Sequence, residues 1–157
     1  GSTTRLLFMG RDAYGTGTQN GSTTVDYVTI ASTGNATDFG DLSTAVHYAA
    51  GVSSNTRAVK CGGWSNSNTT AVNEMDYFTI ASTGNATDFG DMAAATRGAS
   101  GVNNQTRGIS MGGKTPSNIN TIQYITIAST GNTTDFGDMY RSGGDGSSKS
   151  NGHSGLS

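Results

Sequence analysis

The chain has 157 residues, a length that suits one modest domain, and its formal net charge at pH 7 is −2. Charged residues make up 13% of the chain and hydrophobic residues 32%, with 24 glycines and a single cysteine. Because no basic cluster and no long apolar run occurs, we expect no nucleic-acid partner and no membrane insertion. The lone cysteine excludes an intrachain disulfide framework. β-branched and aromatic residues recur at ordered positions, so the composition does not indicate disorder.

The first repeat is predicted to span residues 3–55, after a Gly-Ser pair at 1–2 that we interpret as the remnant of an expression tag. It opens with TRLLFMG, a β-prone run that ends in glycine. VDYVTIAS then alternates with period two, which predicts a strand, and STGN predicts a turn because Gly and Asn tolerate positive φ. ATDFGDL and the small-residue run HYAAGVSS are each predicted to form a further strand.

The same order of segments recurs in two more repeats, which we place at residues 56–105 and 106–150. The period is about 50 residues, a value typical of solenoids, propellers and arrays. Four short strands per repeat favour the blade of a β-propeller over a β-solenoid, whose coils are shorter. The windows LSTAVHYAA and MAAATRGAS are rich in alanine, but Gly and Thr interrupt them, so we prefer strands to a helix there. Phe39, Phe89 and Phe136 are each the only large apolar residue of a short strand, and we expect all three to be buried between sheets.

A recurring set of residues resembles the kelch repeat. It consists of a glycine pair, a tyrosine, an aromatic residue before Leu or Met, and an arginine; its members in the second repeat are Gly62, Gly63, Tyr77, Phe89, Met92 and Arg97. Phenylalanine stands where kelch repeats usually have tryptophan. The resemblance implies an all-β fold, a β-propeller of four-stranded antiparallel kelch-like blades, with three blades per chain.

The repeated sequence DYxTIASTGNATDFGD also resembles tandem repeats in structural and tail-associated proteins of marine bacteriophages, cyanophages among them. Residues 151–157 resemble the C-terminal tail of such proteins. This resemblance implies a viral, non-enzymatic structural protein of the virion, associated with the tail or a fibre. Such a protein would be extracellular or part of the virion, and would mediate assembly or recognition of the host surface.

The titratable residues show no catalytic or metal-binding pattern. His47 and His153 do not stand at the spacing of metal ligands, and the repeated DFGD aspartates are interpreted as turn caps rather than Ca²⁺ ligands. No acid–base pair breaks the symmetry of the repeats, so a hydrolase on this scaffold is disfavoured. We therefore expect no enzymatic activity, no cofactor and no metal.

The loops that differ between repeats carry the candidate contact residues. They are Arg11, Asp12, Tyr14, Trp64 and Lys114. Loops on a rigid scaffold are common recognition sites, and an exposed Trp or Tyr can stack on a sugar or anchor a protein contact. The partner would be a cell-surface glycan or protein; the alternative for Trp64 is packing between blades. A glycan-binding, lectin-like propeller without a virion role is the alternative function.

Three blades are too few to close a propeller, which typically has four to eight. We therefore expect either a homo-oligomer, in which two chains make six blades, or further blades of a longer parent protein. The first blade also lacks an inner strand, and residues Gly143–Ser150 are the candidate to supply that strand to the first blade of a partner chain.

Overall fold

The computed structural model describes residues 5–13, 20–65 and 70–147, which form an all-β structure in which every strand pair is antiparallel. No helix forms in these residues, so the alanine-rich windows belong to strands and loops as predicted. The strands are β1 (Arg5–Phe8), β2 (Asp12–Ala13), β3 (Asn20–Thr29), β4 (Thr37–Val46), β5 (Ala50–Ser53), β6 (Arg57–Cys61), β7 (Trp64–Ser65), β8 (Thr70–Ala71), β9 (Glu74–Thr79), β10 (Thr87–Asp91), β11 (Ser100–Asn103), β12 (Arg107–Met111), β13 (Thr121–Thr126) and β14 (Thr134–Asp138).

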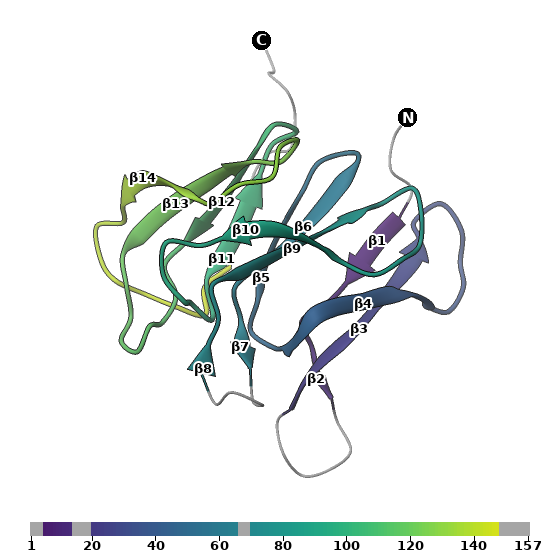
Figure 1. Ribbon diagram of the computed structural model, residues 1–157, viewed down its shortest axis with the longest axis horizontal. Coiled ribbons are helices and arrows are strands. Elements are labelled where there is room, and N and C mark those ends of the chain that lie inside the picture. Colours follow the sequence, from purple (N-terminus) through teal and green to yellow (C-terminus); the bar gives the residue numbers. More distant parts are fainter. Residues whose placement is uncertain (1–4, 14–19, 66–69, 148–157) are drawn as a thin grey trace.

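Three sheets stand side by side (Figure 1). The first sheet has the order β1-β3-β4, with the short β2 paired to the start of β3. The second sheet has the order β5-β6-β9-β10, and the third has the order β11-β12-β13-β14. The small hairpin β7-β8 extends from the second sheet's β6–β9 connection.

Each complete sheet takes one strand from the sequence repeat before it. β5 lies within residues 3–55 but pairs with β6, and β11 lies within residues 56–105 but pairs with β12. In the first sheet, β1 pairs with β3 only, and no described strand pairs with its second edge. The strand exchange ties each repeat to the next through main-chain hydrogen bonds.

The middle strands are buried on both sides because neighbouring sheets cover both of their faces. In β9, Met75 is 0% exposed and Phe78 is 2% exposed, although consecutive odd and even positions point in opposite directions. Phe78 packs edge-to-face on Phe39 of the first sheet, with ring centroids 5.6 Å apart. The two-sided apolar pattern of MDYFTIAS is the consequence of this stacking.

The core consists of two clusters, one for each junction between sheets. The cluster between the first and second sheets includes Val25, Phe39, Leu42, Val46, Val72 and Phe78. The cluster between the second and third sheets includes Val52, Val59, Cys61, Met75, Phe89, Met92, Ile125 and Ile127. Apolar burial of this size is the main favourable term that holds the stack together.

The expectation that all three DFGD phenylalanines are buried is confirmed for Phe39 and Phe89 and wrong for Phe136. Their exposed fractions are 2%, 1% and 50%. The local sequence and strand position of the three residues are the same. Phe39 and Phe89 are covered by the following sheet, whereas the described chain has no sheet that follows the third. The stack is therefore open at this end.

Candidate functional site: a cleft between the second and third sheets

A cleft of about 560 Å³ lies where the connections that lead into β5 and β11 meet. Tyr48 and Ala49 belong to the connection from β4 to β5, and Arg97 and Gly98 to the connection from β10 to β11. Its full lining is Tyr48, Ala49, Arg97, Gly98, Ala99, Lys114, Asp145 and Gly146. The cleft thus combines residues from three successive repeats.

Main-chain hydrogen bonds link three of the residues that line this cleft. The Gly98 N–H donates to the Tyr48 carbonyl oxygen at 2.8 Å, and the Asp145 N–H donates to the Gly98 carbonyl oxygen at 2.8 Å. The three residues occupy the same repeat position and share a left-handed backbone, with φ of 55°, 63° and 58° for Tyr48, Gly98 and Asp145. A bulky residue rarely adopts this conformation, so Tyr48 is strained, and such strain concentrates at functional positions.

The side chains around the cleft offer both charge and an aromatic ring. The guanidinium carbon of Arg97 lies 4.1 Å from the centroid of the Trp64 ring, a cation–π contact that holds Arg97 in place. The backbones of Arg97 and Lys114 are paired, with N–H···O distances of 3.2 and 2.9 Å. Tyr48 is 45% exposed. The cleft thus offers the cations of Arg97 and Lys114, the Asp145 carboxylate and the exposed Tyr48 ring. This combination suits a polar or weakly acidic ligand.

The residues predicted from the variable loops do not all gather at one place. Lys114 lines the cleft, and Trp64 supports it through Arg97. Arg11 lies on the first sheet, where its guanidinium forms an ion pair with Asp26 at 2.7 Å. Asp12 is in β2, while its side chain and the whole of Tyr14 lie outside the described residues.

Sequence reasoning missed three cleft residues, Tyr48, Arg97 and Asp145. Arg97 was noted as a member of the kelch-like pattern but was not assigned to a site. The available signal was the repeat position itself: Tyr48 and Asp145 stand where the second repeat has Gly98. Non-glycine residues at a position that favours glycine can mark a functional site.

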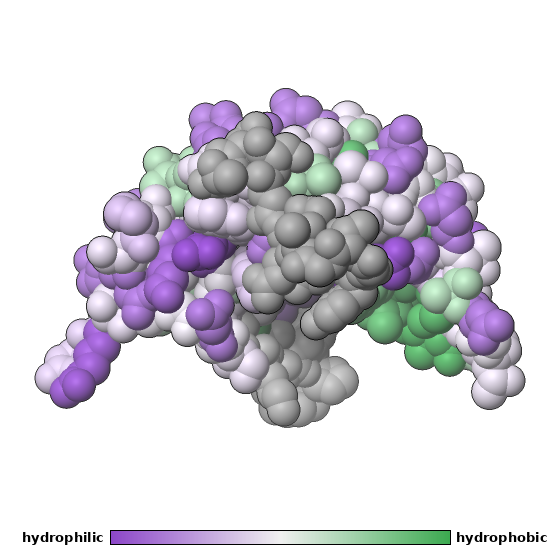
Figure 2. Space-filling model, turned by 90° about the horizontal axis from the view of Figure 1, so that it is seen from below, coloured by the Kyte–Doolittle hydropathy of each residue, from purple (hydrophilic) through white to green (hydrophobic). Residues whose placement is uncertain are grey.

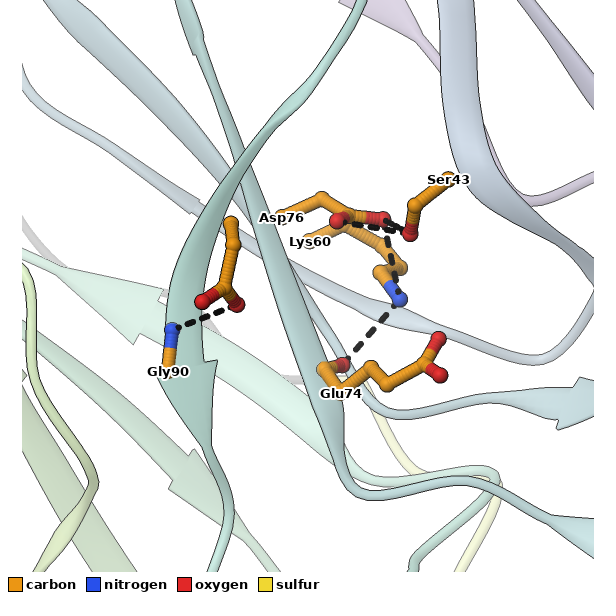
Figure 3. A network of polar contacts seen from close by, with 6 residues as sticks. Ser43, Lys60, Glu74, Asp76 and Gly90 are labelled. Atoms are coloured by element: carbon orange, nitrogen blue, oxygen red, sulfur yellow. Dashed lines mark hydrogen bonds and ion pairs between the residues drawn. The ribbon is translucent and has the colours of Figure 1, made fainter.

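A second polar cluster is buried between the first and second sheets (Figure 3). The Lys60 ammonium is 0% exposed and lies 3.4 Å from an Asp76 carboxylate oxygen, and it donates to the Glu74 carbonyl oxygen at 3.1 Å. The Ser43 hydroxyl, from the first sheet, contacts both Asp76 carboxylate oxygens at 2.8 Å. A buried charge needs such partners, so this cluster fixes how the two sheets meet.

The residues that occupy the position of the Lys60–Asp76 pair differ between the second and third sheets. Lys60 pairs directly with Asp76 across β6 and β9, whereas Ser110 pairs with Gln123 in the third sheet. The neutral pair can occupy the same place because it carries no charge to desolvate. The Lys60–Asp76 pair is therefore specific to one junction, and we assign it a structural role.

Cys61 is buried and is not placed to act as a reactive thiol. Cys61 is buried in the core, and the loss of hydration raises the pKa of its thiol to about 12, although nearby Lys60 acts in the opposite direction. Within the described residues, no group of three or more His, Cys, Asp or Glu side chains could hold a metal ion. The same residues contain no helix long and apolar enough to cross a bilayer.

Comparison with protein-family models and with curated proteins gave no match. The structure defines the class of the protein as all-β, built from repeated antiparallel sheets.

Proposed function

We propose that the chain is a three-bladed segment of a kelch-like β-propeller that serves as a structural or adhesion element of a bacteriophage virion, in its tail or a fibre. Two features support a propeller segment. The second and third sheets have the same four-strand order, and each begins with a strand that precedes its repeat. The resemblance of the repeats to phage tail-associated proteins supports the virion role.

The observation that carries the binding part of this proposal is the cleft beside Tyr48. Its residues come from segments outside the strands, which is where scaffold proteins usually place recognition. The Tyr48 ring is accessible, while Arg97 is positioned in advance by Trp64 and so loses little freedom on binding. A host-surface carbohydrate that bears acidic groups fits this combination of a ring and two cations.

The alternative is a glycan-binding propeller with no part in a virion, and it is favoured by the same cleft. Stacking of a sugar on an exposed tyrosine requires only the cleft and no larger assembly. The two functions share the ligand class and differ in where the protein is found.

A glycan array that includes neutral and acidic sugars tests the binding part. We expect the wild-type chain to bind acidic glycans on the array. Tyr48→Ala and Lys114→Ala should each weaken this binding by at least about tenfold, in line with the loss of a central contact. Tyr140→Ala is the matched control, because Tyr140 is 95% exposed and does not line the cleft. Equal binding by the wild type and the Tyr48 and Lys114 variants would contradict the cleft as the site.

Immunogold labelling of purified particles of the encoding phage tests the virion role. Label at the tail or fibres is the expected result. Unlabelled particles, together with retained glycan binding, would favour the lectin-like alternative.

A further inference from the structure

The two junctions within the chain are made by the same contacts, and each end of the stack carries one half of those contacts. At the first junction, the Gly84 N–H donates to the Phe39 carbonyl oxygen at 2.8 Å. At the second, the Gly131 N–H donates to the Phe89 carbonyl oxygen at 2.7 Å. The glycine of each TGN turn thus bonds to the DFGD strand of the sheet before it.

The asparagine that follows each turn glycine adds a second contact. Asn85 accepts a hydrogen bond from the Asp41 N–H at 3.1 Å, and Asn132 accepts one from the Asp91 N–H at 3.0 Å. In the first sheet, the turn residue that corresponds to these asparagines is Asn35.

An arginine in the first strand of each repeat makes a third contact. The Arg5 guanidinium donates to the Ile80 carbonyl oxygen at 3.0 Å, and the Arg57 guanidinium donates to the Ile127 carbonyl oxygen at 3.2 Å. Arg107 is the corresponding residue of the third sheet. Its guanidinium lies 4.3 Å from the centroid of the Tyr124 ring, compared with 4.5 Å for Arg57 and Tyr77, so it is already oriented for the same contact.

Burial shows that both end faces are incomplete. Ile30 is 66% exposed, whereas its counterparts Ile80 and Ile127 are 5% and 0% exposed. Phe136 is 50% exposed at the other end. A Cβ added to Gly90 would lie 2.6 Å from the Gly131 carbonyl oxygen, but a Cβ added to Gly137 would meet nothing within 4 Å.

The exposed face of the first sheet also carries Leu6 and Phe8, each 58% exposed. In Figure 2, apolar surface gathers toward the side on which the first sheet lies in Figure 1. A contiguous apolar patch of this kind typically marks an interaction surface. We call the surface of Leu6, Phe8 and Ile30 the leading face, and the surface of Arg107, Phe136 and Gly137 the trailing face.

We propose that the trailing face of one copy of this chain binds the leading face of a second copy, and that two copies close into a ring through two such joints. The occupant is a second copy because the two faces are the complementary halves of a junction that the chain already forms twice. In this joint Gly34 donates to Phe136, and Arg107 donates to Ile30. The joint is heterologous, and such joints form closed rings when the rotation between subunits allows closure.

The segment Gly143–Ser150, which we expected to supply a strand to the first sheet of a partner chain, does not enter this joint. Its residues 143–147 form no strand, and residues 148–150 lie outside the described part of the chain.

Sedimentation analysis of the wild-type chain at micromolar concentration is the first test. The expected species has twice the 16.0 kDa mass of one chain. Ile30→Asp and Phe136→Asp should each raise the dissociation constant by about 30-fold or more, the usual effect of damaging a central contact. Ala81→Asp is the control, because it places the same charge on an exposed turn of the second sheet.

Mixing the two variants tests the head-to-tail arrangement. Ile30→Asp leaves the trailing face intact, and Phe136→Asp leaves the leading face intact, so an equimolar mixture should form a two-chain complex that neither variant forms alone. Circular dichroism of each variant confirms that the fold is retained.

The proposal is overturned if the wild-type chain sediments with the mass of one chain, or if either variant keeps the wild-type mass. It is also overturned if the mixture remains at the mass of one chain. These outcomes do not depend on glycan binding or on a virion role, so this proposal and the proposed function can fail separately.

Discussion

Truncation of two equivalent phenylalanines measures what a covering sheet contributes to stability. Phe89 and Phe136 have the same local sequence, and both make edge-to-face contacts with a tyrosine of their own sheet. The centroids lie 6.0 Å apart for Phe89 and Tyr77, and 6.1 Å apart for Phe136 and Tyr124. Substitution by alanine removes this local contact from both, so the difference between the variants reports the packing between sheets.

The expected costs differ several-fold. Phe89 is 1% exposed, and Phe89→Ala should lower the free energy of unfolding by about 3–5 kcal/mol, because it removes buried area and leaves a cavity. Phe136 is 50% exposed, so Phe136→Ala should cost only about 1 kcal/mol in a single chain, roughly half of the value for full burial and with no enclosed cavity.

Urea unfolding followed by the fluorescence of Trp64, the one tryptophan, measures both values. The experiment is done at protein concentrations low enough to keep the chains separate, and an unchanged m-value shows that the unfolding transition stays comparable. Equal losses for the two variants would refute the reasoning that the following sheet covers Phe89 alone. Repetition at high concentration should increase the cost of Phe136→Ala if chains associate.

Four further experiments have defined outcomes. Lys60→Met should lower stability by about 3–5 kcal/mol in thermal or urea unfolding because it leaves the Asp76 carboxylate buried without its cation; a loss below about 1 kcal/mol would show that water reaches this pair. Gly90 and Gly137 have similar backbone φ angles of 132° and 134°, but only a Cβ at Gly90 clashes with the Gly131 turn of the next sheet. Gly90→Ala should therefore lower the melting temperature more than Gly137→Ala does. Equal decreases would contradict the close approach of the Gly131 turn. Cys61 should resist iodoacetamide in the folded protein at pH 8 and react after unfolding, and rapid native labelling would argue against its burial. Because burial raises the pKa of the Cys61 thiol from its usual 9.0 to about 12, the unfolded chain loses this proton at lower pH than the folded chain, and the free energy of unfolding should fall as pH rises from about 9 toward 12.

The main strands and turns of this protein could be predicted from local sequence patterns, whereas β2 and the hairpin β7-β8 lie in segments that were predicted as loops. Period-two alternation in MDYFTIAS and the STGN turn are local signals, and the structure contains β9 and the following turn where they predict them. The repeat also predicted that the units would look alike. These features depend on neighbours in the sequence, so no tertiary information was needed.

The candidate cleft could be predicted only in part. Differences between the loops identified Lys114, which lines the cleft, and Trp64, which contacts the cleft residue Arg97. Tyr48, Arg97 and Asp145 come from segments about one repeat apart, and main-chain hydrogen bonds between these segments bring them together. Local patterns carry no information on that convergence.

The sequence by itself determined an all-β chain of three similar units, with a glycine wherever a neighbouring turn approaches a DFGD strand. Only the tertiary structure decided which of these units are covered. Phe89 and Phe136 have the same local sequence but opposite environments, and β5 pairs with β6 across a repeat boundary. The physical reason is that burial and strand pairing depend on which surfaces are near in space. At the ends of a repeated stack, identical sequences meet different neighbours.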